Sequence, residues 1–192
     1  MRLVKSAAIR AAERGFSLVE TLIASAILAA ALVSLAELLA ISIRANAVAR
    51  SGSLTMMFAV QKMEQLRSLA WGYDTAGSPF SDLTSDTTTP LERSTGGTGL
   101  SPSPADALLR NTDGYADYLD VSGSQLGGGT APPPGSLYVR RWSIEPLPTN
   151  PNATLLLEVF VTRVDRDVTD EASTTRRPED TWLFSVKTRK AR

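Results

Sequence analysis

The organisation of this chain is decided by Arg14-Gly15-Phe16-Ser17-Leu18-Val19-Glu20 and by the apolar run from Thr21 to Ile43 that follows it. The run carries one charged side chain, Glu37, and consists mainly of alanine and leucine, which favour helix over strand. A helix of this length, at about 1.5 Å per residue, reaches roughly 35 Å and can cross a bilayer core of about 30 Å. Because a carboxylate is costly beside such a run, Glu20 is a candidate functional residue.

The segment from Gly15 to Glu20, followed by the apolar run, resembles the class III signal motif of type IV pilins and pseudopilins. The resemblance implies that a prepilin peptidase cleaves after Gly15 on the cytoplasmic face of the inner membrane and then N-methylates Phe16. It also implies that Glu20, the fifth residue of the mature chain, acts in subunit assembly. The implied partners are this peptidase and other minor pilins or pseudopilins.

A lone carboxylate in the low-dielectric core of a filament costs several kcal/mol unless it is paired. The methylated amine of Phe16 stays cationic, so we expect it to pair with Glu20 on the same or a neighbouring subunit. Glu20 would then set the position at which a subunit stops sliding into the filament.

The composition argues against several kinds of site. The chain has 192 residues with 20 basic and 20 acidic side chains. Its net charge is therefore zero, and it shows no excess of positive charge of the kind that binds nucleic acid. It contains no cysteine, which excludes disulfides and thiolate metal sites, and no histidine, the commonest metal ligand and general base. We therefore expect a protein that is not an enzyme and that needs no cofactor or metal.

Two other interpretations of the N-terminal region remain. An ordinary secretory signal peptide would use Ala45-Asn46-Ala47 as its cleavage site, but the apolar run exceeds the usual length of about 7–15 residues. A plain signal anchor is the second. The anchor and the pilin-like interpretation both predict a single pass through the inner membrane, with the basic leader, residues 1–15, in the cytoplasm and the C-terminal domain in the periplasm.

Residues 16–71 are predicted to form one long helix, because no proline precedes Pro79. Its first part, residues 16–43, would be the transmembrane and assembly segment, and residues 44–71 its amphipathic continuation. Spacings of three and four predict the buried face of that continuation: Met56, Ala59, Val60, Met63, Leu66 and Ala70. Gly72 is expected to cap the end of the helix.

Residues 72–136 are predicted to be a Gly/Pro-rich acidic loop region. They hold eleven of the thirteen glycines and seven of the eleven prolines, and eight acids against two arginines give a charge of −6. Within them, residues 115–121 could form a short strand or turn. Asp113, Asp117 and Asp120 suggest calcium, but their spacing does not fit an EF-hand loop, so solvated carboxylates are the favoured interpretation.

Residues 137–192 are predicted to form an antiparallel sheet with strands at 137–144, 155–164 and 181–189. Imperfect alternation around Arg140-Arg141 predicts a bulge there. In the last strand, Trp182, Phe184 and Val186 should share one face.

A long N-terminal helix packed on a C-terminal antiparallel sheet of three to four strands is an α+β arrangement, which is also the pilin fold. The order of the elements, with its Arg-Arg-Trp strand, resembles minor pilins of the PilV kind and minor pseudopilin I of type II secretion. This resemblance implies a structural subunit that helps to initiate or cap a type IV pilus or a type II secretion pseudopilus. The alternative is a singly anchored periplasmic binding module that captures a ligand through residues 72–136.

Overall fold

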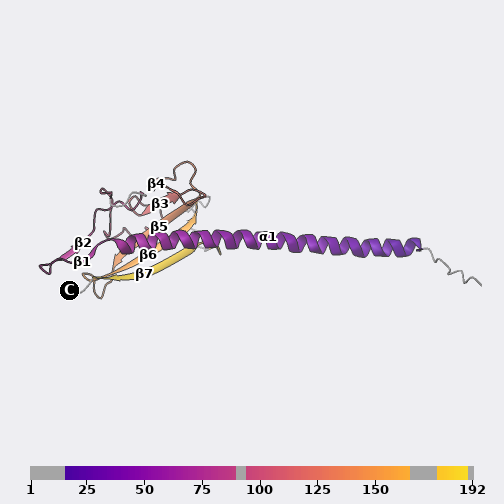
Figure 1. The fold of residues 1–192 in the computed structure, drawn as a ribbon, viewed down its shortest axis with the longest axis horizontal. Helices are drawn as coiled ribbons and strands as arrows, with labels where there is room; N and C mark the ends of the chain where they lie inside the picture. The colour runs from indigo at the N-terminus through magenta and orange to yellow at the C-terminus, as the bar shows by residue number, and fades with distance from the viewer. Residues whose placement is uncertain (1–15, 90–93, 165–176, 190–192) are drawn as a thin grey trace, which may run out of the picture. The chain divides into compact units, whose positions relative to one another are not determined.

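The computed structural model describes residues 16–89, 94–164 and 177–189. These residues form one long helix, α1 (Leu18–Ser68), and seven strands. The strands are β1 (Trp71–Tyr73), β2 (Pro79–Ser81), β3 (Ala116–Leu119), β4 (Gln125–Gly128), β5 (Tyr138–Pro146), β6 (Thr154–Arg163) and β7 (Thr181–Thr188). The chain divides into two compact units, residues 1–46 and 47–192, and α1 contributes to both (Figure 1).

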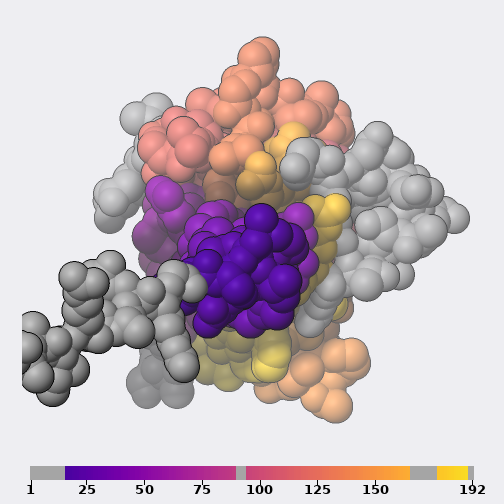
Figure 2. Space-filling model, turned by 90° about the vertical axis from the view of Figure 1, so that its right-hand side faces the viewer, coloured from indigo at the N-terminus to yellow at the C-terminus, as the bar shows by residue number. Residues whose placement is uncertain are grey.

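The first unit contains the apolar part of α1. Every residue from Phe16 to Arg50 is exposed. The helix is continuous and contains no proline. Figure 2 looks along this segment, drawn in indigo, and shows side chains on all sides of its axis. A helix that is apolar all round is stable only inside lipid or against other apolar surfaces.

The second unit is built on a five-stranded antiparallel sheet with the order β4-β3-β5-β6-β7. The predicted α+β class is confirmed, but the predicted number of three to four strands is too small. Strand β3 falls within residues 115–121, where a short strand or turn was expected, and β4 lies in the segment predicted to be loop. Strand β3 pairs with both β4 and β5, although glycine residues in β4 and Asp117 in β3 depress β-propensity there. Strands β1 and β2 form a separate hairpin.

The predicted bulge at Arg140-Arg141 is wrong. Strand β5 pairs without a register shift with both β3 and β6, and the irregularity lies instead between β3 and β4, at Tyr118 and Leu119. Consecutive residues of β5 from Tyr138 to Ile144 are all buried, so both faces of this strand are covered. The pattern looked imperfect because both arginines are buried, not because the strand is distorted.

The C-terminal part of α1 packs on one face of this sheet (Figure 1). The core contains four residues of α1 and seven of the two central strands: Phe58, Ala59, Met63 and Leu66; Tyr138, Trp142 and Ile144; and Leu155, Leu157, Val159 and Val161. Of the predicted helix face, Ala59, Met63 and Leu66 are buried, whereas Met56 and Val60 are exposed.

The buried face is rotated relative to the prediction and includes Thr55, Phe58 and Lys62. The charge of Lys62 made it look like a surface residue, because lysine is almost never fully buried unless it is paired. On the sheet, Trp182, Phe184 and Val186 share one face as predicted, and that face is exposed.

Helix α1 ends at Ser68, and Gly72 lies in β1, so the predicted glycine cap is wrong. The carbonyl of Arg67 accepts a hydrogen bond from Lys187 Nζ, which satisfies one of the terminal helix carbonyls. The β1–β2 hairpin turns at Gly77, whose φ of 85° suits glycine. Arg189 holds the hairpin by stacking 3.6 Å above the Trp71 ring and donating to the carbonyl of Gly72 at 3.0 Å.

Candidate functional site: the N-terminal motif and a buried charge network

The N-terminal motif begins α1 through a side-chain cap. Ser17 Oγ accepts a hydrogen bond of 3.2 Å from the backbone N–H of Glu20, and the Ser17 carbonyl accepts the first helical bond, from Thr21. Serine at the N-cap with glutamate three residues later is the pair found in capping boxes. A carboxylate in the first turn also complements the partial positive charge of the helix N-terminus. Ser17 therefore caps the helix and the Glu20 carboxylate is placed where it favours the helix N-terminus, a local role that the Ser-x-x-Glu spacing signals.

Of the three predicted motif residues, the structure describes two. Gly15 lies outside the described residues. Phe16 directly precedes the cap and its side chain is 80% exposed, and Glu20 is exposed one turn further along α1. Cleavage after Gly15, methylation of Phe16 and the assembly role of Glu20 stay predictions.

Helix α1 has the length and composition of a membrane span. Its most apolar window has a mean hydropathy of 2.4 and is not buried at all within the chain. The polar side chains in this part bond to their own helix: Ser25 Oγ donates to the Thr21 carbonyl, and Ser34 Oγ donates to the Ala30 carbonyl at 3.1 Å. Such bonds lower the cost of placing hydroxyl groups in lipid.

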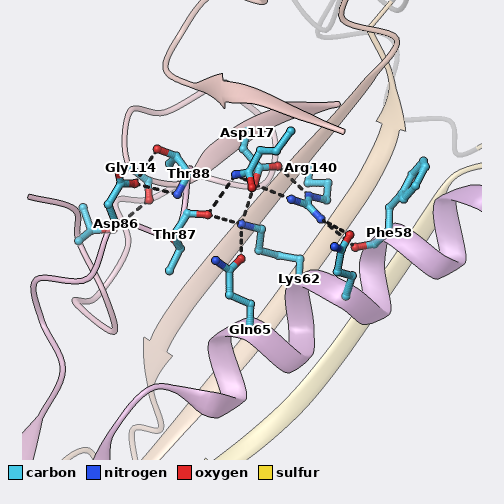
Figure 3. A network of polar contacts seen from close by, with 12 residues as sticks. Phe58, Lys62, Gln65, Asp86, Thr87, Thr88, Gly114, Asp117 and Arg140 are labelled. Carbon is cyan, nitrogen blue, oxygen red and sulfur yellow. Dashed lines mark hydrogen bonds and ion pairs between the residues drawn. The ribbon is translucent and has the colours of Figure 1, made fainter. Parts of the chain in front are cut away.

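A second polar centre lies inside the folded unit, where Asp117 of β3 meets two cations (Figure 3). Its Oδ2 is 2.6 Å from Lys62 Nζ of α1, and its Oδ1 accepts from Arg140 Nε of β5 at 2.7 Å. A second bond of 2.9 Å from Arg140 Nη2 to Oδ2 makes the arginine pair bidentate. Asp117 and Arg140 face each other in the register of β3 and β5, and Lys62 reaches them from the buried helix face.

Neighbouring groups satisfy the remaining donors of this network. Lys62 Nζ donates to Gln65 Oε1 at 2.8 Å and to the Thr87 carbonyl at 2.7 Å. Gln125 Nε2 donates to Asp117 Oδ2 at 2.9 Å, and Arg140 Nη1 donates to the side-chain oxygen of Gln61 at 3.1 Å. The network thus joins α1, β3, β4, β5 and the segment before residue 90.

The pKa values of Lys62 and Asp117 are both shifted from their usual values. Burial lowers the pKa of Lys62 to about 8, because desolvation and the charge of Arg140 outweigh the attraction of Asp117. Burial alone would raise the pKa of Asp117, but the charges of Lys62 and Arg140 hold it below its usual range. The pKa of Lys62 is therefore lowered mainly by burial, and that of Asp117 is lowered because two cations share this one carboxylate.

The positions of Asp117 and Asp120 do not support a calcium site. Asp117 is fully buried against two cations, so it is not the solvated carboxylate that the sequence suggested. The Asp120 carboxylate accepts from the backbone N–H groups of Ser122 and Ser124, each at 2.8 Å. Within the described part of the chain, no group of three or more acidic, cysteine or histidine side chains is placed to hold a metal.

Arg141, the next residue along β5, is buried without a carboxylate. Its Nε donates to Asn111 Oδ1 at 2.8 Å, its Nη1 has no hydrogen-bond partner, and no ion pair to it is found among the described residues. Burial lowers the pKa of this guanidinium to about 10. Adjacent arginines on β5 are therefore buried in opposite electrostatic conditions.

Comparison with known proteins identifies the N-terminal segment. Residues 10–36 match the prokaryotic N-terminal methylation motif, and this match includes Gly15, Phe16 and Glu20. No curated protein and no solved structure matches the chain significantly. Together with the exposed apolar helix and the α+β unit, the motif supports a type IV pilin-like protein, anchored in the membrane by a single pass, that is a substrate of prepilin peptidase. Proteins with this motif are structural subunits that assemble with other pilins.

The paired and unpaired arginines of β5 should respond differently to the same substitution. Arg140→Met should destabilise the folded unit by about 3 kcal/mol or more, because it removes a bidentate partner from the buried Asp117. Arg141→Met should be neutral within about 1 kcal/mol, or stabilising, because it removes a buried charge that has no counter-ion. Urea unfolding followed by tryptophan fluorescence measures both, and equal destabilisation by the two substitutions would contradict this assignment.

The lowered pKa of Asp117 predicts a pH dependence. Unfolded Asp117 binds a proton more readily than the folded carboxylate, so its stabilising contribution is complete above the unfolded pKa, near 4, and is lost as the pH falls through the folded pKa. The difference in free energy of unfolding between the wild type and Asp117→Asn should therefore shrink as the pH is lowered below about 4. Unfolding curves at a series of pH values test this, and a difference that stays constant would show that Asp117 is not held ionised.

Proposed function

We propose that the protein is a minor pilin or minor pseudopilin, a structural subunit that helps to initiate or cap a type IV pilus or a type II secretion pseudopilus. The observation that carries this proposal is the methylation motif at residues 10–36, which leads directly into an apolar helix with no buried face. In lipid that surface is satisfied before assembly, and in a filament it is satisfied by the same surface of other subunits.

The proposed chemistry concerns the first turn of α1. Cleavage after Gly15 by prepilin peptidase creates a cationic amine on Phe16, which the same enzyme methylates. Glu20 lies one turn along the helix and is exposed, so it is available to an amine of its own or a neighbouring chain. When the helix leaves lipid for a filament core, pairing of these charges offsets the cost of burying each alone.

The apolar segment is suited to close packing of helices. Small residues recur along it, at Ala24, Ser25, Ala29 and Ala36, and small side chains let helix backbones approach one another. The chain contains no cysteine pair, and no proline interrupts α1. Both features differ from the common pattern of major pilins, and they favour a minor subunit.

The proposed location follows from the charge distribution. The leader, residues 1–15, carries four basic residues and one acidic residue, so the basic end should remain in the cytoplasm. The unit from residue 47 onward would then lie in the periplasm, and the protein would reside in the inner membrane until it joins a filament.

The proposed assembly role of Glu20 can be separated from the helix cap made by Ser17. Glu20→Gln retains a residue that suits the third helical position but removes the charge, whereas Ser17→Ala removes the cap and keeps the charge. We expect Glu20→Gln to be inserted and cleaved normally but to co-purify with partner pilins at least about tenfold less well than the wild type, since a buried amine without a counter-ion costs more than 1.4 kcal/mol.

The matched control is Ser17→Ala, which should co-purify like the wild type. Equal losses in the two variants would show that helix capping, and not charge pairing, limits assembly. Full recovery of Glu20→Gln with its partners would contradict the pairing mechanism and would favour the alternative of a singly anchored binding module.

A further inference from the structure

The folded unit contains an open groove of about 1250 Å³ between the last turns of α1 and two loops. One wall is formed by the end of α1 from Gln61 to Ser68 with Leu69 and Ala70 after it, and the other by residues 80–89 and 123–125. Arg140 and Thr87, which belong to the charge network in Figure 3 or contact it, also line the groove. The charge network therefore lies on the buried side of the groove wall.

The charges around this groove are mainly negative. Glu64, Asp82 and Asp86 line it, whereas Arg140 is the one cation among the described lining residues. Arg140 and Lys62 share the charge of Asp117, so the network behind the wall contributes a single net positive charge. Glu64 is also paired with Arg67 at 3.4 Å, so the described residues around the groove carry a net charge of −1, which favours a cationic ligand.

The carboxylates on the loop wall are held in fixed positions. Asp82 Oδ1 accepts from the backbone N–H groups of Thr84 and Ser85 at 3.2 and 3.0 Å, and its Oδ2 accepts from the Ser85 hydroxyl at 2.6 Å. Asp86 Oδ1 accepts from the backbone N–H of Thr88 at 2.8 Å, and its Oδ2 makes no bond in the described structure. Because these groups are already ordered, a ligand loses little binding free energy in arranging them.

A second observation at the groove is an unsatisfied polar side chain. Thr87 lines the groove and is 98% buried, since its relative exposure is 2%. Its carbonyl accepts from Lys62 and Gln125, but its hydroxyl oxygen has no hydrogen-bond partner. A buried hydroxyl without a partner is uncommon and is satisfied when a ligand brings a polar group to it.

We propose that this groove binds an extended segment of a partner protein through its lysine or arginine side chains. The ordered carboxylates receive the cationic side chains. The side-chain NH2 groups of Gln61 and Gln65, whose oxygens stay bonded to Arg140 and Lys62, donate to the peptide backbone together with the Thr87 hydroxyl. An extended chain leaves its backbone groups free to make such bonds. The inference goes beyond the proposed function, because it does not depend on cleavage, methylation or filament assembly.

The test uses the full chain in a non-ionic detergent and fluorescence anisotropy of labelled hexapeptides. The probe alternates glycine and lysine, and two control peptides replace every lysine with glutamine or glutamate. We expect only the lysine peptide to bind, with an affinity that falls as salt is added. The double substitution Asp82→Asn and Asp86→Asn keeps the Oδ1 acceptors and should weaken binding at least tenfold.

The matched control is Asp106→Asn with Asp113→Asn, which removes the same charge from residues that do not line the groove. This pair should leave the affinity within twofold of the wild type. Glu64→Gln, on the exposed surface of α1, provides a variant that does not disturb the loop, and it should weaken binding two- to threefold.

Several outcomes would overturn the inference. Equal weakening by the two double substitutions would show that the peptide responds only to overall charge. Equal binding of the glutamine peptide would exclude recognition of cations. Absence of binding by the lysine peptide, or binding of a neutral oligosaccharide in its place, would show that the groove takes no basic peptide.

Discussion

The folded unit depends on the burial of one carboxylate, Asp117. An ionised carboxylate away from water is tolerated only when cations and donors surround it, and here Lys62 and Arg140 supply them from two other elements. Helix α1 must therefore have one rotation about its axis, and β3 must have one register against β5, for all three groups to meet. The apolar core restricts this arrangement less strictly, because hydrophobic contacts are not directional. We infer that the network selects this packing over alternatives that bury similar apolar area.

The N-terminal part of α1 follows the opposite rule. Residues 16–50 are exposed and make no core, so their stability must come from lipid or from other subunits. The methylation motif at residues 10–36 belongs to this part, and the groove belongs to the folded unit. The residues proposed for processing and assembly therefore belong to the apolar segment, whereas the residues proposed for recognition belong to the folded unit.

The sequence predicted features that depend on local pattern. The apolar run, the absence of proline before Pro79 and the alternation in 137–144, 155–164 and 181–189 were sufficient for the long helix, three strands and the α+β class. The sequence also placed the buried residues Ala59, Met63 and Leu66 correctly. These signals are periodic, and helices and strands impose their periods directly on the chain.

The remaining features depend on long-range partners that no local pattern encodes. Strand β3 pairs with the edge of β5 and β4 pairs with β3, so β4 forms through this pairing and not because its glycine residues favour a strand. Lys62 looks like a surface residue, and it is buried only because Asp117 and Arg140 come together 55 and 78 residues later in the chain. The groove is likewise formed by three separate segments, so neither its carboxylates nor the Thr87 hydroxyl could be recognised as a site beforehand.

The most direct test of the account is the intact mass of the protein purified from membranes of cells that contain prepilin peptidase. The account predicts a chain that begins at Phe16 and carries one added methyl group at its N-terminus. In cells without the peptidase, the same measurement should give the uncleaved chain. An unmodified chain that begins at residue 1 in both strains would contradict the account, as would cleavage near Ala47.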